Sequence, residues 1–189
     1  MTPRSIPNPH SQIRIPKSPI RIPHSQIRIP HSAFRIMAHP DYDREIRITR
    51  TARTTQNSIW VCWTTESGMR SWWTQNCRIE PRVGGAYELY FLMDNPPGTQ
   101  GGEGNTILSI EPETRLSFSW NAPPSQPETR CQHTVVDLRI TDLSPTATEV
   151  ELLHRGFGIG SAWDETYAYF QGAWTAVMDR LIAHFEVRH

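Results

Sequence analysis

The most regular pattern in the chain is a stripe of large apolar side chains near the C-terminus. Its members recur every three or four residues, the spacing at which side chains share one face of an α-helix. They are Trp163, Tyr167, Phe170, Trp174, Val177, Leu181 and Phe185. The stripe predicts an amphipathic helix over 163–187, with Ser161 and Asp164 placed to cap its start. About 25 residues at 1.5 Å each would span roughly 37 Å, enough to cross a whole sheet.

Alternation of apolar and polar positions predicts strands before this helix. In the segment 45–52, Ile46 and Ile48 lie on one face of a strand, and polar residues alternate with them. Comparable patterns, separated by turn residues, occur at 86–93, 106–110, 115–120, 134–141 and 148–154. Consecutive strands joined by short turns favour an antiparallel sheet.

Four tryptophans mark the segment between the first strand and the later ones. The sequence NSIWVCWTTESGMRSWW favours a short amphipathic helix, a break at 65–68 and a second short helix over 69–74. The resulting order is β-α-α-β-β-β-β-β-α, with room for one more strand in the middle. It predicts an α+β fold in which the helices gather on one face of an antiparallel sheet.

Residues 1–36 carry no such packing pattern. From position 9 they form four units of seven residues, PHSQIRI, PKSPIRI, PHSQIRI and PHSAFRI. Each unit contains a proline at the same place, and a proline inside a helix costs about 3 kcal/mol, so the period does not indicate a coiled coil. We interpret 1–36 as a low-complexity segment, disordered or extended. It is either a genuine basic arm or translated upstream DNA before a true start at Met37, since seven codons would make a tandem repeat. The folded domain is expected over 37–189.

Charge is divided unevenly between these two parts. Residues 1–36 hold six basic side chains and no acidic one, whereas residues 37–189 hold 13 arginines and 19 acidic residues, a net charge of −6. A mildly acidic domain disfavours nucleic-acid binding, which needs a basic face. Lys17 is the only lysine, so Schiff-base chemistry on a lysine amine is excluded from the domain.

The cysteines and histidines indicate neither a disulfide framework nor a metal site. Cys62, Cys77 and Cys131 are far apart and lack CxxC spacing, which favours free thiols in a reducing compartment. The domain shows no HxxxH or HxH pair and no cofactor-binding glycine motif after a strand. It also has no apolar run near the ~20 residues of a membrane span and no signal-peptide core. We therefore expect a cytoplasmic protein with no metal, no cofactor and no membrane association.

From about residue 46 to the C-terminus, the chain resembles the START-like, or SRPBCC, helix-grip superfamily. Within it, the chain resembles the branch named after the activator of the heat-shock-protein-90 ATPase. The resemblance is carried, in order, by GMRSWW, RVGGAYEL, GEGNTILSIEPETRLSFSW, TEVELLHRGFG and WDETYAYFQGAWTAVMDRL. It implies a curved antiparallel sheet wrapped around the long C-terminal helix, with two short helices after the first strand. The superfamily includes lipid carriers, cyclases and co-chaperone domains, so the resemblance alone selects no single function.

His154 is the most informative polar residue. Alternation over 148–154 places it on the inner face of its strand, together with Val150 and Leu152. It is a hydrogen-bonded core residue, a polar handle in a pocket, or a general base, since a histidine pKa lies near neutrality. The aromatic residues of the inner faces pose the same question, because rings at these positions either fill a core or line a cavity.

The residues expected to contact a ligand are large rings on the sheet and the helix, with His154 as the polar group. They are Trp73, Tyr87, Tyr90, Phe118, Trp120, His154, Phe157, Trp163, Tyr167, Phe170 and Trp174. We expect a small domain, monomeric or homodimeric, that binds a hydrophobic or aromatic small molecule between the sheet and the C-terminal helix. One alternative is a module that docks on a chaperone or another protein, as the resemblance to a stress-response co-chaperone implies. The other is a cyclase- or hydrolase-type enzyme that uses His154 as acid or base.

Overall fold

The computed structural model describes residues 44–186. The elements in chain order are β1 (Glu45–Ala52), α1 (Gln56–Thr64), α2 (Glu66–Trp72), β2 (Asn76–Ile79), β3 (Tyr87–Tyr90), β4 (Gly101–Gly102), β5 (Ile107–Glu111), β6 (Arg115–Trp120), α3 (Pro127–Arg130), β7 (Thr134–Ser144), β8 (Ala147–Arg155) and α4 (Ser161–Glu186). The heptapeptide repeat and Met37 lie outside the described residues, so the division after residue 36 stays a prediction. Among the helices of this described part, none has the length and apolar character needed to cross a membrane.

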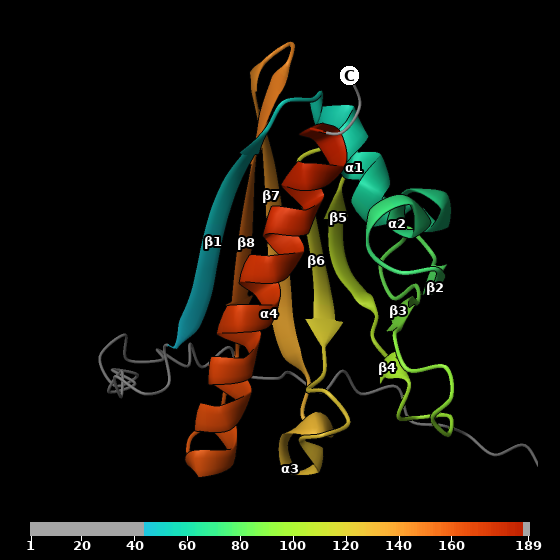
Figure 1. Ribbon diagram of the computed structural model, residues 1–189, viewed down its shortest axis with the longest axis vertical. Coiled ribbons are helices and arrows are strands. Elements are labelled where there is room, and N and C mark those ends of the chain that lie inside the picture. Colours follow the sequence, from blue (N-terminus) through green and yellow to red (C-terminus); the bar gives the residue numbers. More distant parts are fainter. Residues whose placement is uncertain (1–43, 187–189) are drawn as a thin grey trace, which may run out of the picture. The chain divides into compact units, whose positions relative to one another are not determined.

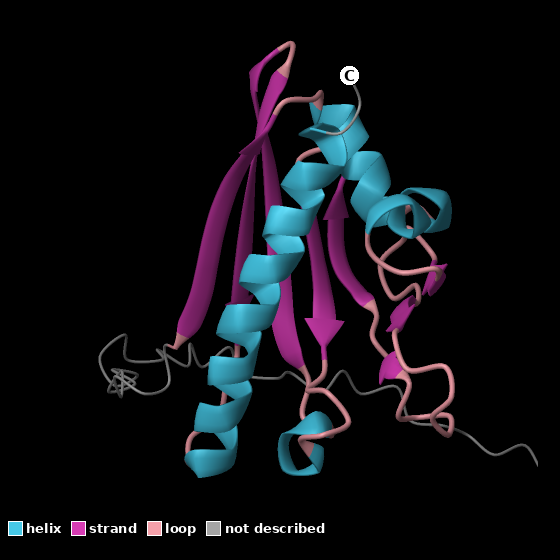
Figure 2. Cartoon of the chain, viewed as in Figure 1, coloured by secondary structure: helices cyan, strands magenta, loops and turns pink. Residues whose placement is uncertain are grey.

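A five-stranded antiparallel sheet in the order β1-β8-β7-β6-β5 forms one layer, and α4 lies across its face (Figures 1 and 2). Paired residues form a row across this sheet, which runs Ile46, His154, Val136, Phe118 and Ile107. All five side chains are buried, so the row belongs to the face that α4 covers. The expected α+β helix-grip fold, a curved antiparallel sheet around a long C-terminal helix, is confirmed.

Helix α4 buries a slightly different stripe from the expected one. It extends for 26 residues, about 39 Å at 1.5 Å per residue. Its buried positions are Trp163, Thr166, Phe170, Trp174, Met178 and Leu181. Tyr167, Val177 and Phe185 are only half-buried. The buried stripe therefore follows spacings of three and four that include Thr166 and Met178, which a search for large rings passes over.

The two short helices meet at a single residue. Thr65 ends α1 and caps α2, because its hydroxyl donates to Val61 O at 2.9 Å and accepts from Gly68 N at 3.0 Å. The expected break over 65–68 is therefore too long, and α2 begins at Glu66 rather than at residue 69. The helix pair follows the first strand as expected, and α2 ends beside the tryptophan at position 73.

A second, three-stranded sheet in the order β2-β3-β4 continues from the first through the isolated bridge between Ala86 and Thr106. β2 and β4 are absent from the expected order, because four and two residues are too few to show a period. The strand expected over 86–93 ends at Tyr90. There the chain turns, since the N–H groups of Phe91 and Leu92 both donate to Gln100 O. This turn places the side chains of Phe91 and Leu92 opposite α4 rather than in a sheet.

Candidate functional site

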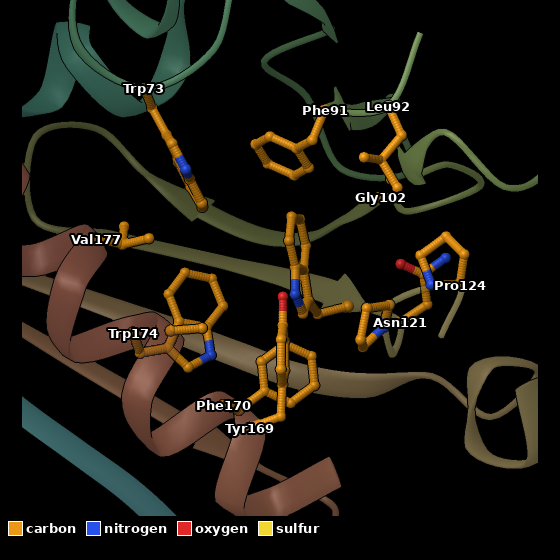
Figure 3. A pocket seen from close by; sticks show the side chains of 14 residues that line it. Trp73, Phe91, Leu92, Gly102, Asn121, Pro124, Tyr169, Phe170, Trp174 and Val177 are labelled. Atoms are coloured by element: carbon orange, nitrogen blue, oxygen red, sulfur yellow. The ribbon is translucent and has the colours of Figure 1, made fainter. Parts of the chain in front are cut away.

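An apolar pocket opens between the α4 face, the end of β6 and the turn that joins β3 to β4 (Figure 3). We call it the aromatic pocket. It encloses about 270 Å³. It is lined by Trp73, Phe91, Leu92, Gly101, Gly102, Trp120, Asn121, Pro123, Pro124, Tyr169, Phe170, Ala173, Trp174 and Val177. None of these residues carries a charge, and Asn121 is the one side-chain amide among them.

Four segments supply the walls: the end of α2, the turn with β4, the end of β6 with the residues after it, and α4. Trp73 reaches in from the end of α2, and Phe91 and Leu92 on the turn, with Gly102 in β4, lie opposite the helix in Figure 3. Four of the expected ligand-contacting residues line the pocket, namely Trp73, Trp120, Phe170 and Trp174. The sequence reasoning missed the turn residues because it assigned Phe91 and Leu92 to a strand. It also missed Tyr169 and Ala173, which flank the stripe on α4.

Three expected residues on the sheet lie outside the aromatic pocket. Tyr87 and Phe118 have no exposed surface, and their rings pack against each other at 4.2 Å between centroids. The Tyr87 hydroxyl donates to Trp63 O at 3.0 Å, and burial raises the Tyr87 pKa well above its usual value. Tyr90 points away, where its hydroxyl donates to Glu88. Burial, with the Glu88 hydrogen bond, raises the Tyr90 pKa to about 12. These are structural residues in this arrangement.

A second aromatic group closes the N-terminal part of α4. Phe157 packs edge-on against Tyr167 at 5.1 Å and against Trp163 at 6.3 Å. The Tyr167 hydroxyl donates to Glu45 O, which ties α4 to β1. Phe157, Trp163 and Tyr167 therefore lie outside the aromatic pocket, although all three were expected to contact a ligand. Their packing joins the helix to the sheet.

His154 lies beneath the pocket, not in its wall. The ring has no exposed surface, and both nitrogens are hydrogen-bonded. The indole N–H of Trp174 donates to Nδ1 at 2.8 Å, and Nε2 lies 2.6 Å from Thr134 Oγ1. The Thr134 hydroxyl donates in turn to Trp120 O at 2.9 Å. An indole nitrogen can only donate, so Nδ1 must accept and the proton of the neutral ring lies on Nε2.

The three hydrogen bonds therefore all donate in the same sense: Trp174 to His154, His154 to Thr134, and Thr134 to Trp120 O. We call this chain of hydrogen bonds the His154 relay. Burial lowers the pKa of His154 to about 3. A second proton would have to enter at Nδ1, where it would face the indole N–H. Both ends of the relay belong to pocket-lining tryptophans, so His154 fixes two walls without touching the cavity.

The pocket rings contact one another closely. Trp73 lies 5.7 Å from Phe91, 5.7 Å from Trp174 and 6.2 Å from Trp120 between ring centroids. The planes of Trp73 and Trp120 differ by 29°, and those of Phe170 and Trp174 by 20°. Pairs of nearly parallel rings with offset centres offer faces on which another flat ring can stack.

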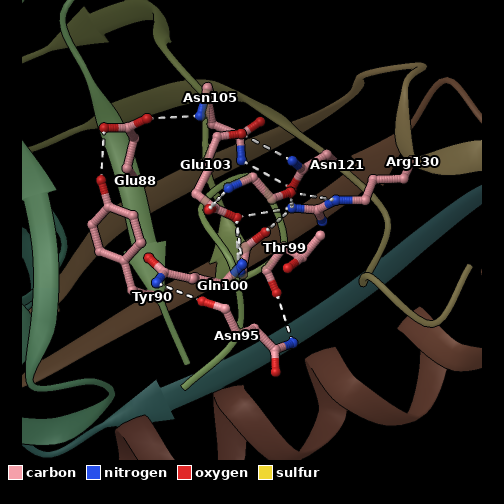
Figure 4. Close-up of polar contacts among 12 residues, drawn as sticks. Glu88, Tyr90, Asn95, Thr99, Gln100, Glu103, Asn105, Asn121 and Arg130 are labelled. Carbon is pink, nitrogen blue, oxygen red and sulfur yellow. Dashed lines mark hydrogen bonds and ion pairs between the residues drawn. The ribbon is translucent and has the colours of Figure 1, made fainter. Parts of the chain in front are cut away.

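An ion pair between Glu103 and Arg130 holds the two non-helical walls together (Figure 4). The Glu103 carboxylate accepts from the amides of Gly98, Gln100 and Gly101 and from Arg130 at 3.0 Å. The Arg130 guanidinium also donates to the carbonyls of Gly98, Gly101 and Ala122. We call this group the Glu103–Arg130 latch. It joins the turn that carries Phe91 to the segment that follows Trp120.

Within residues 44–186, no group of three His, Cys, Asp or Glu side chains lies close enough together to hold a metal ion. Cys62 and Cys77 are buried, and Cys131 is exposed.

Comparisons with known proteins show the family. A family model described as activator of Hsp90 ATPase homolog 1-like protein matches residues 53–186. No curated protein matches the chain. Protein MLL2253 from Mesorhizobium loti is 18% identical, with a TM-score of 0.61 over 77% of this chain and 99% of that protein.

Two other solved structures share this fold. The Aha1 dimer from Colwellia psychrerythraea is 16% identical, with a TM-score of 0.56 over 76% of this chain and 97% of that one. An HSP90 activator from Plasmodium falciparum is 14% identical, with a TM-score of 0.53 over 70% of this chain and 88% of that one. At these identities the structural likeness shows the fold alone. Because the family model spans most of the chain, the chain belongs to the family of activator of Hsp90 ATPase homolog 1-like proteins.

Proposed function

We propose that this member of the activator of Hsp90 ATPase homolog 1-like family binds a small, flat, apolar molecule in the aromatic pocket. The observation that supports this most directly is the lining itself, in which six aromatic side chains surround about 270 Å³. Transfer of an apolar ligand from water into such a site gains about 25 cal/mol per Å² of buried apolar surface. Binding rather than chemistry is the function that this geometry favours.

The volume sets the size of the ligand. A protein cavity of about 150 Å³ lined by apolar side chains holds a benzene molecule. The aromatic pocket, at about 270 Å³, is therefore large enough for two fused rings. Trp73 and Trp120 support a flat shape, because the faces of aromatic rings favour stacking with another ring.

The charge of the ligand follows from the same lining. No side chain of the pocket wall is ionised, and an unpaired charge moved into an apolar site loses its hydration without compensation. The favoured ligand is therefore neutral. A catalytic role for His154 is not part of this proposal, since both of its nitrogens are occupied and its ring has no exposed surface.

The test is a substitution that fills the pocket and removes nothing from the core. Ala173 is half-buried and lines the pocket on α4. Replacing it in an Ala173→Trp variant should occupy the ligand volume. Native mass spectrometry of gently purified wild-type protein should show an added mass from a co-purifying ligand. If no ligand co-purifies, naphthalene is added as the probe and its adduct is measured. The variant should lose at least 90% of that adduct at equal protein concentration.

Ala176→Trp is the matched control, because Ala176 is exposed on the same helix. It should retain binding. Both variants should keep melting temperatures within a few degrees of the wild type. If Ala173→Trp bound the probe as well as Ala176→Trp does, binding in this pocket would be refuted.

A second function is favoured by a different observation. Phe91, Leu92 and Met93 are 44%, 45% and 51% exposed on adjacent positions of one turn. Exposed apolar residues in a cluster commonly contact a protein partner, and one structural neighbour is described as an HSP90 activator. We propose a chaperone of the HSP90 type as the alternative partner. Saturable binding of purified chaperone that is lost in a Leu92→Asp, Met93→Asp variant would support it, and absence of saturation would exclude it.

A further inference from the structure

The three tryptophans of the aromatic pocket differ in what their indole N–H groups contact. The N–H of Trp174 donates to His154 Nδ1 at 2.8 Å and is turned away from the cavity. Within residues 44–186, the N–H groups of Trp73 and Trp120 have no hydrogen-bond acceptor. Trp72, next to Trp73, donates its N–H to Cys62 O at 3.1 Å. His154 thus accepts the N–H of one pocket tryptophan, Trp174, while the N–H groups of Trp73 and Trp120 remain without an acceptor among the described residues.

These two donors are not sealed in the core. The buried side-chain atoms without a partner in the described part include Trp63 Nε1, but not the indole nitrogens of Trp73 or Trp120. Trp120 as a whole is only 5% exposed and lines the pocket. Trp73 lines the same pocket and extends into it (Figure 3).

An unpaired donor in an apolar site has an energetic consequence. A polar group that loses water and gains no partner costs about 1–3 kcal/mol, so a ligand that covers such a donor without accepting from it binds less tightly. Sites that present hydrogen-bonding groups discriminate strongly against analogues that leave them unpaired. An apolar ligand alone is therefore an incomplete match for the aromatic pocket.

We infer that the aromatic pocket recognises neutral, planar, two-ring aromatic molecules that carry a hydrogen-bond acceptor, a carbonyl oxygen or a ring nitrogen, directed at the indole N–H of Trp120 or Trp73. This inference rests on the proposed function and adds the polarity of the ligand to it. The Tyr169 hydroxyl also lines the pocket and can donate or accept, so the preference for an acceptor rests on the two indole N–H groups, which can only donate.

Three probes of nearly equal shape separate the possibilities. Quinoline offers an acceptor nitrogen, indole offers a donor N–H, and naphthalene offers neither. Titration of ¹⁵N-labelled protein with each probe would follow the seven tryptophan indole signals, assigned by single Trp→Phe variants. Quinoline should move the Trp120 or Trp73 N–H signal downfield, and it should bind at least fivefold more tightly than indole.

A variant series tests the same point independently. Trp120→Phe removes one donor and also changes the shape of the pocket, so its effect is read as the ratio of quinoline to naphthalene affinity. This ratio should fall about fivefold to tenfold, the worth of one hydrogen bond. Trp60→Phe is the matched control, since Trp60 packs against the core outside the pocket lining, and it should leave the ratio unchanged.

The outcomes are distinguishable. If naphthalene and indole bind as tightly as quinoline and no pocket indole N–H signal moves downfield, the acceptor requirement is overturned while the pocket remains a binding site. If none of the three probes binds, the proposed function itself fails, and the inference falls with it. Should Trp120→Phe fail to fold, the wild-type titration still decides.

Discussion

His154 shows how a titratable residue can be structural. Its Nδ1 accepts from Trp174 and its Nε2 donates to Thr134, so one tautomer satisfies every group in the relay. The unfolded chain would protonate this histidine near pH 6.5, whereas burial lowers the pKa in the folded state to about 3. Between these two values the unfolded state binds one more proton. The contribution of His154 is therefore fully present above pH 6.5 and declines as the pH falls towards 3.

We predict that acidification destabilises the protein through this residue. From pH 7 to pH 5, one such group lowers the free energy of unfolding by about 2 kcal/mol. Denaturant unfolding at both pH values would measure this change in the wild type and in a His154→Gln variant, whose amide can accept and donate without titrating. The variant should lose this part of the pH dependence. His133→Gln, at an exposed site, should keep it. Equal pH slopes in wild type and His154→Gln would contradict the assignment.

The sequence placed His154 on the inner face correctly, because alternation along a strand needs only local information. It could not select among core residue, polar handle and general base. That choice depends on Thr134 and Trp174, which are each 20 positions away in the chain. The same holds for Tyr87 and Phe118. Alternation predicted that their side chains point inward, but not that they lie outside the pocket lining.

At the scale of elements, the turn between β3 and β4 decides the form of the pocket mouth. Its backbone amides at Gly98, Gln100 and Gly101 all donate to one carboxylate, that of Glu103. The side chains of Glu103 and Arg130 are 15% and 13% exposed, so water competes weakly for this ion pair. Glu103 thus binds three amides of the turn, while Arg130 and the side chains of Asn95 and Gln100 bind its carbonyls.

Neutralising that carboxylate should loosen the turn selectively. In a Glu103→Gln variant, hydrogen exchange at the amides of Gly98, Gln100 and Gly101 should accelerate by about tenfold or more, because hydrogen bonds to a charged group contribute about 1.5–3 kcal/mol. Exchange in β7 and β8 should change far less. Glu128→Gln is the control, at an exposed carboxylate close to Arg130 in the chain, and should leave the turn amides unchanged. Uniform acceleration across the sheet would show global destabilisation instead.

Element prediction from sequence succeeded where a period had room to repeat. The strands at 45–52 and 115–120 and the long final helix agree with the structure within about two residues, since each presents several turns or alternations. It failed at β2, at β4 and at the end of β3. In these cases the chain direction is set by hydrogen bonds to distant groups, such as Gln100 O for Phe91, and not by local pattern.

At the scale of the whole domain, the order of elements and the family resemblance together predicted the helix-grip architecture. The position of the cavity within it was not predictable. Side chains between α4 and the sheet decide where the cavity lies. Near Phe157 and Trp163 they fill the space between helix and sheet. Beside Ala173 and Gly102 they leave it open.

The ring contacts around Trp73 also have an optical consequence. Trp63, Trp72, Trp120 and Trp174 all lie within 6.2 Å of it between centroids. The strong far-ultraviolet transition dipoles of indoles at this separation couple, so the cluster should give an exciton couplet in far-ultraviolet circular dichroism. A molecule stacked on one ring would then change this couplet. Trp73→Phe should remove most of the couplet while Trp60→Phe preserves it, and an unchanged spectrum in Trp73→Phe would show that the indoles act separately. The protein would thus report the occupancy of its own pocket without an added label.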